Sequence, residues 1–307
     1  MRPLIRLLSK LPFPVLHVLS SGLALLMFRV FGYRKKTVRG NLERSFPEKS
    51  PAEIRAIERQ FYANFADILV ETIKNFSITE TELRDRCRLT TPEVAKELWA
   101  KQVNVAGISS HLANWEILAL SLSLEFQHHC YGVYKPLSDP KMDAEIRVSR
   151  QRFGIEMIPI KAVRGVLENP PSKPWLMGLL GDQAPHDYEK AFEVQFLNQR
   201  TFVVPGPGLL TLEQGLTPIW GWMRRRPDLG RSRFEWGVEI LSTEASGFEW
   251  TSADRAQFER IARVHGVTLE TAERALALTR RVAERLEAMI RANPADWLWT
   301  HRRWKSR

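Results

Sequence analysis

The sequence predicts a single α/β domain, in which a mostly parallel central sheet is flanked by helices and an N-terminal membrane-associated helical segment comes first. Short apolar runs of strand length alternate along the chain with stretches of helical periodicity, and turn residues separate them. The run 11–28 carries no formal charge, which predicts the N-terminal segment. We expect that segment over residues 1–35 and the main domain over 36–307.

The uncharged run 11–28 is flanked by basic residues on both sides. Its length is at the lower edge of what spans a hydrocarbon core about 30 Å thick, and Pro12 and Pro14 weaken a spanning helix. No small-residue cleavage site follows, so a signal peptide is not predicted. We therefore expect an anchor that lies in the membrane interface or just spans it. A buried N-terminal core helix is the alternative.

Capping sequences predict three helices before the first strand. Ser50 and Glu53 form a capping box, which starts a helix that runs to about residue 76. Apolar residues recur along it at helical spacing and predict a core-facing stripe. Cap sequences at 79–82 and 91–92 start a second and a third helix, the last of which leads into the central strand.

The stretch 103–116 joins a buried strand to a helix. Apolar residues as far as Ile108 predict the strand, two serines its exit turn, and Leu112 onward the helix. His111 is expected at the corner, with Glu116 about a turn and a half into the helix. If the corner bends back, the Glu116 carboxylate accepts a hydrogen bond from the Nδ1–H of His111. This leaves Nε2 free to accept a proton from a nucleophile. The alternative is a helix-capping His111 and a solvated Glu116.

The alternation continues through the second half of the chain. Strands are expected over 130–134, 155–160, 175–180 and 218–223, an antiparallel edge strand over 234–241, and helices after 139, 205 and 269. Asp182 directly follows the strand 175–180. Because ligands of parallel sheets collect at the carboxyl ends of strands, we expect Asp182 and His111 at the same edge of the sheet.

Composition limits the partners. The 307 residues carry a net charge of +10, which suits nucleic acid, acidic lipid headgroups or an acidic protein. Cys87 and Cys130 have no metal-like spacing and are expected to be passive thiols. Phosphate-loop, dinucleotide, H-E-x-x-H and C-x-x-C motifs are absent from the sequence, so no cofactor and no metal site is predicted.

The segment from His111 to Glu116, HLANWE, matches the H-x4-D/E signature of the lysophospholipid/glycerolipid acyltransferase superfamily, and it resembles the late (secondary) acyltransferases of lipid A biosynthesis. Four further segments of that family occur here in the same order, and the five cover nearly the whole chain. They are 38–48 (VRGNLERSFPE), 134–152 (a Tyr-Lys-Pro segment and an arginine-rich helix), 178–183 (GLLGDQ) and 297–305 (WLWTHRRWK). Asn198 departs from the family, which usually has Gly there.

The resemblance implies an O-acyltransferase on the cytoplasmic face of the bacterial inner membrane. It implies transfer of a fatty acyl group from an acyl carrier protein to a hydroxyl of a lipid A precursor, with His111 as general base and Glu116 as its orienting partner. No G-x-S-x-G elbow offers a covalent carrier, which favours direct transfer. The residues expected to bind substrate are Asn114, Arg150, Arg152, Arg164 and Asp182.

Three alternatives stay open at this point. Some members of the family acylate aminolipids or other lysolipids. A nucleic-acid-binding protein would suit the charge, the basic cluster around Arg225 and the ten tryptophans, but no RNA- or DNA-binding motif is recognisable, so no nucleic acid is expected as a partner. A non-catalytic membrane scaffold is the third.

Overall fold

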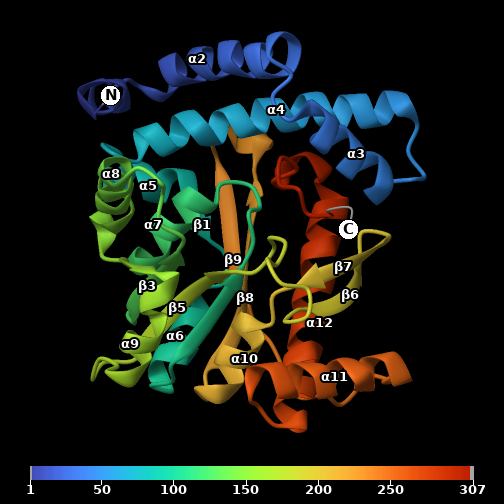
Figure 1. Ribbon diagram of the computed structural model, residues 1–307. Coiled ribbons are helices and arrows are strands. Elements are labelled where there is room, and N and C mark those ends of the chain that lie inside the picture. Colours follow the sequence, from blue (N-terminus) through green and yellow to red (C-terminus); the bar gives the residue numbers. More distant parts are fainter. Residues whose placement is uncertain (1, 305–307) are drawn as a thin grey trace.

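The computed structural model describes residues 2–304, and a seven-stranded sheet forms its centre (Figure 1). The strand order is β1 (Cys87–Leu89), β9 (Phe234–Ile240), β8 (Thr217–Arg225), β2 (Val105–Ser109), β5 (Trp175–Leu180), β3 (His129–Tyr134) and β4 (Glu156–Pro159). All neighbouring pairs are parallel except β8 with β9. The predicted single α/β domain with a mostly parallel sheet is confirmed.

Two hydrophobic clusters cover opposite faces of the sheet. Ile219 of β8 packs in one cluster with α6 (Pro92–Ala100) and α7 (Trp115–Glu125). Trp220, the next residue of the same strand, packs in the other with α10 (Gly206–Glu213) and α12 (Leu269–Ala292). Successive residues of a strand point to opposite faces, so helices protect both sides of β8 from water.

One strand differs from the prediction. The residues predicted as an antiparallel edge strand form β9, and its antiparallel pairing with β8 is confirmed. However, β9 is not at the edge, because β1 pairs in parallel with its first three residues, Phe234 to Trp236. A three-residue strand is too short to show a periodicity in the sequence.

All three predicted helix starts agree with the structure, but only two of them have a side-chain cap. Ser50 and Thr79 each complete a capping box, which starts α4 (Pro51–Lys74) and α5 (Glu80–Arg86). Thr91 makes no side-chain cap for α6, because its hydroxyl accepts a hydrogen bond from the backbone of Val238 at 2.8 Å. The remaining α-helices of the second half are α8 (Pro140–Arg150), α9 (Val163–Glu168) and α11 (Ser252–His265), of which α9 and α11 were not predicted.

A hairpin that the periodicity did not reveal, β6 (Phe192–Phe196) and β7 (Gln199–Val203), lies beside α12. Its two turn residues, Leu197 and Asn198, have φ values of 49° and 62°. Asparagine tolerates this left-handed region better than most residues, which explains how it can stand where the family usually has glycine.

At the N-terminus, α1 (Arg2–Ser9) and α2 (Phe13–Leu25) precede a π-helical turn (Leu26–Val30) and α3 (Lys35–Ser45). The run Phe13–Val30 is long and apolar enough to cross a membrane, with a mean hydropathy of 1.6. Only 22% of it is buried, so it is not a buried core helix. It lies along α4, across the top of the domain in Figure 1.

Candidate active site

The register of two neighbouring strands brings His111 and Asp182 together. Strands β2 and β5 are parallel, and their last residues, Ser109 and Leu180, are partners. His111 and Asp182 each lie two residues beyond those ends. The Asp182 carboxylate accepts the backbone N–H of His111 at 2.9 Å, and its other oxygen lies 2.7 Å from Nδ1 of the same residue.

The surroundings of the pair select one tautomer of His111. Asp182 Oδ2 also accepts the indole N–H of Trp297 at 2.8 Å, so the buried carboxylate is held from three sides. A proton on Nδ1 then faces Asp182, and Nε2 is left as an acceptor. Consistent with this assignment, the side-chain nitrogen of Gln183 lies 3.4 Å from Nε2 and can donate to it.

Electrostatics suit the pair for proton transfer. Burial by itself would lower the pKa of His111, but the Asp182 carboxylate outweighs it and raises that pKa above its ordinary value. Burial would raise the pKa of Asp182, yet the neighbouring His111 and the hydrogen bonds to it hold this pKa at about 2. The carboxylate therefore stays charged at neutral pH and can stabilise an imidazolium.

Glu116 does not contact Nδ1 of His111, contrary to the expectation for an orienting partner. Its carboxylate forms a bidentate pair with Arg150, at 2.8 and 2.6 Å. The reason is local: Ala113 has a φ of 49°, and the helix begins only at Trp115, which puts Glu116 in its first turn. The charges of Glu116 and Arg150 still act on the pKa of His111, in opposite directions.

Asn114, expected to bind substrate, is fully buried and caps α7. Its side-chain oxygen accepts the backbone N–H groups of Glu116 and Ile117 at 3.1 and 3.0 Å. Its side-chain nitrogen donates to Glu71, another buried residue, whose pKa burial raises. Asn114 therefore supports the corner from inside the protein and does not face a ligand.

Two of the arginines expected at the site make their contacts elsewhere. Arg152 donates to the backbone oxygen of Asn75 at 2.7 Å and lies over the ring of Phe153. Arg164, on α9, has a side chain that is 90% exposed and pairs with Glu168 one turn away. The structure thus brings together His111, Asp182, Glu116 and Arg150, but gives neither Arg152 nor Arg164 a contact with them.

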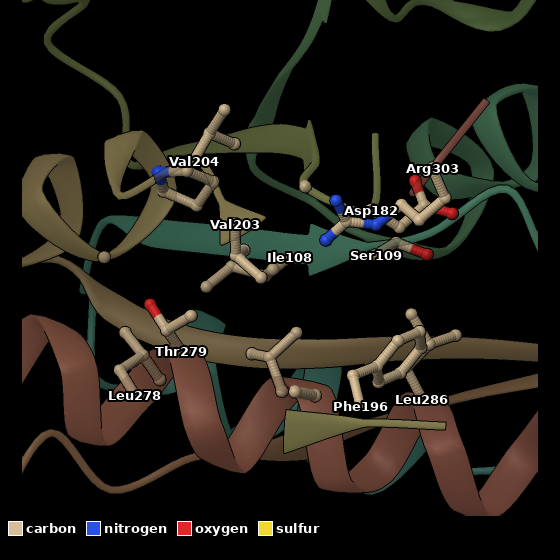
Figure 2. A pocket seen from close by; sticks show the side chains of 15 residues that line it. Ile108, Ser109, Asp182, Phe196, Val203, Val204, Leu278, Thr279, Leu286 and Arg303 are labelled. Atoms are coloured by element: carbon tan, nitrogen blue, oxygen red, sulfur yellow. The ribbon is translucent and has the colours of Figure 1, made fainter. Parts of the chain in front are cut away.

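A largely apolar pocket adjoins Asp182 (Figure 2). The empty space within it is about 540 Å³, a figure that includes open solvent. Asp182, Ser109 and Arg303 lie at one end of the view in Figure 2, and Leu278 and Thr279 at the other. Its apolar lining includes Ile108, Phe196, Val203, Leu278, Val282 and Leu286.

Two residues of this site, Trp297 and Arg303, were not expected there from the sequence. Trp297 holds Asp182, and Arg303 lines the pocket with 5% of its surface exposed. Both belong to the segment WLWTHRRWK, which was recognised as a distinctive motif. Nothing in its spacing indicates that it folds back onto the ends of β2 and β5.

The chain is similar to known proteins over nearly its whole length. The chain is 25% identical over 305 residues to the lipid A biosynthesis lauroyltransferase of Escherichia coli (strain K12). The aligned region covers 98% of this chain and 89% of that protein. A family model described as bacterial lipid A biosynthesis acyltransferase matches residues 3–306. Because this match spans nearly the whole sequence, the chain belongs to the bacterial lipid A biosynthesis acyltransferase family.

Proposed function

We propose that this acyltransferase moves a fatty acyl group from an acyl carrier protein thioester to a hydroxyl of a lipid A precursor, with His111 as general base and Asp182 as its orienting partner. The observation that carries the proposal is the His111–Asp182 pair beside an apolar pocket in a member of this family. In this mechanism Glu116, neutralised by Arg150, contributes electrostatically and does not orient the imidazole.

The chemistry is a direct transfer. Nε2 of His111 accepts the proton of the acceptor hydroxyl as its oxygen attacks the thioester carbonyl carbon. The new C–O bond forms, the C–S bond breaks, and the carrier thiol leaves with the proton that Nε2 returns. Asp182 stabilises the intermediate imidazolium and keeps the Nδ1 proton in place.

The pocket is the proposed site of the acyl chain. Apart from Asp182, Arg303, Ser109 and Thr279, its lining consists of apolar side chains and glycines. A saturated chain gains free energy by leaving water for such a lining, at about 25 cal/mol per Å². The carbonyl would then stop at the polar end, near the His111–Asp182 pair.

The carrier protein assignment rests on charge. A protein of net charge +10 attracts an acidic carrier, and Arg147 on α8 and Arg302 near the C-terminus are exposed. Arg150 and Arg303 do not add to this exposed charge, because Arg150 pairs with Glu116 and Arg303 is buried. Lys305 and Arg307 lie outside the described residues.

We propose further that the N-terminal helices lie in the plane of the membrane, on the cytoplasmic face of the inner membrane. The inner side of α2 is held by hydrogen bonds from Ser20 to Asp67, which also pairs with Arg231, and between His17 and Ser232. The outer side is apolar: Leu7, Val18, Leu25, Val30 and Phe31 are each at least 60% exposed. Basic residues flank this surface and complement anionic headgroups.

The test is thiol release by the purified protein in detergent, given an acyl carrier protein thioester and a lipid A precursor. His111→Ala is expected to lower turnover by about two to four orders of magnitude, the usual cost of losing a general base. His129→Ala is the matched control, because His129 also pairs with a carboxylate, that of Glu156, but on β3 and with 38% of its side chain exposed.

Near-normal turnover in His111→Ala would refute the mechanism. If the wild-type protein acylates an aminolipid or a lysolipid but no lipid A precursor, the proposed acceptor is wrong and that lipid takes its place. If the wild-type protein acylates none of these lipids, the result would favour the alternative of a non-catalytic membrane scaffold.

A further inference from the structure

Arg303 is, with Asp182, one of two charged residues among those that line the pocket. One nitrogen, Nη1, donates to the backbone oxygen of Phe202, but Nε is buried without an acceptor among the described residues. In Figure 2 the guanidinium extends past Asp182 toward Ile108 and Val203. Arg303 is therefore a cation in a largely apolar pocket, and its Nε–H is an unused hydrogen-bond donor.

Asp182 does not supply the missing hydrogen-bond acceptor of Arg303. Both of its oxygens already accept hydrogen bonds, from His111 and from Trp297, and no hydrogen bond joins it to Arg303. Burial lowers the pKa of Arg303 to about 10, against the opposing effect of the Asp182 charge, so the guanidinium remains protonated at neutral pH. A buried donor without an acceptor is costly in a native protein, and a polar group of a ligand in this pocket would supply the acceptor.

The acyl group would bring such a partner. If the hydrocarbon chain fills the apolar part of the pocket, its carbonyl group comes to the polar end, which is lined by Arg303 and by Asp182, the partner of His111. The carbonyl oxygen becomes negative when the hydroxyl attacks, and donors fixed at that position stabilise it more than they stabilise the substrate.

We propose that Arg303 is a catalytic residue that binds the carbonyl oxygen of the acyl donor and stabilises the oxyanion. The proposal rests on the acyl transfer proposed above. The attacking oxygen adds to the carbonyl carbon while His111 takes its proton, and the carbonyl π electrons move onto the oxygen that Arg303 holds. They return as the C–S bond breaks, and the thiolate takes the proton from His111.

The experiment is steady-state kinetics of Arg303→Met and Arg303→Lys, with Arg302→Met as the matched control because Arg302 is the exposed neighbour. Arg303→Met is expected to lower kcat about 10²–10³-fold, as for the loss of one oxyanion donor, with little change in KM for the donor. Arg303→Lys should recover part of the loss, and Arg302→Met should stay near wild type. Added methylguanidinium should partly restore Arg303→Ala.

Thermal melts separate this role from a structural one, because Arg303 also holds β7 through Phe202. If Arg303→Met fails to fold, the folded Lys variant decides by its kcat. Wild-type kcat in either folded variant would overturn the proposal, and so would a loss that a shift of pH fully restores, since Arg303 would then act only through the His111–Asp182 pair. An inactive wild type, or an active His111→Ala, would instead overturn the proposed function itself.

Discussion

At the scale of single residues, the site depends on how one carboxylate shares its oxygens. Asp182 accepts the backbone and ring N–H groups of His111 and the indole of Trp297, which fixes the imidazole in position and orientation. Glu116, the acidic residue of the HLANWE segment, is neutralised by Arg150 instead. The two carboxylates therefore have different environments, and their removal should have different effects.

The dependence of kcat/KM on pH tests this division. In the proposed mechanism His111 must be neutral to accept a proton, so kcat/KM should fall as pH drops through the pKa of His111, which Asp182 raises. Asp182→Asn removes that charge, so the pKa should fall, the acidic limb should move to lower pH, and the plateau rate should decrease because the imidazole is less well oriented.

Glu116→Gln is the comparison for this measurement. The charge of Glu116 also raises the pKa of His111, but less than that of Asp182, so the acidic limb should shift less. A larger shift in Glu116→Gln than in Asp182→Asn would show that Glu116 governs the base.

At the scale of elements, the corner between β2 and α7 is supported by a chain of buried hydrogen bonds. Asn114 caps the helix and donates to Glu71 of α4, and Glu71 accepts the hydroxyl of Ser232, which also contacts His17 of α2. The N-terminal helices and the corner between β2 and α7 are thereby parts of one polar network. A change at its centre should affect both stability and turnover.

Asn114→Ala is expected to lower the free energy of unfolding by about 1–3 kcal/mol, because it removes the cap and leaves Glu71 without one of its donors. Turnover should also fall, since α7 carries Glu116. Urea denaturation measures the stability. Asp139→Ala, which removes the exposed cap of α8, is the control and should cost about 1 kcal/mol with little effect on turnover. Equal effects of the two variants would contradict the role of the network.

At the scale of the whole molecule, exposed apolar side chains gather on the N-terminal helices. Val18 and Phe31 are 73% and 75% exposed. The double variant Val18→Glu, Phe31→Glu should bind anionic vesicles about tenfold or more weakly, because it buries less apolar surface and adds like charge, while its melting temperature stays unchanged. Leu269→Glu, an equally large change at a 56% exposed position on α12, is the control in vesicle flotation. Unchanged binding by the double variant would exclude this surface as the membrane contact.

The whole-molecule charge predicts a salt dependence. Steering of an acidic carrier acts on encounter and is screened as the Debye length falls from about 30 Å at 0.01 M to about 8 Å at physiological ionic strength. We expect kcat/KM for the carrier-bound donor to fall steeply over this range, with kcat nearly constant. Reversing the charges of Arg147 and Arg302 should flatten the response. Equal efficiency of acyl-coenzyme A as donor, measured side by side, would refute the carrier protein assignment.

The sequence by itself determined the class of fold, the family, and the place of the corner. Alternating periodicities and capping boxes are local signals, so α4, α5 and the parallel strands other than β1 followed from them. His111 and Asp182 were both expected at the carboxyl ends of strands, and both are there. The division of the chain near residue 35 stays a prediction.

Only the tertiary structure decided which carboxylate meets His111. The answer depends on the register of β2 against β5, strands that lie about seventy residues apart in the chain, and on the left-handed conformation of Ala113, which turns Glu116 toward Arg150. The burial of Arg303 beside Asp182 has the same kind of cause, since the C-terminal segment returns to the sheet after α12. Residue spacing specifies contacts within an element, whereas contacts between distant segments follow from how the elements pack.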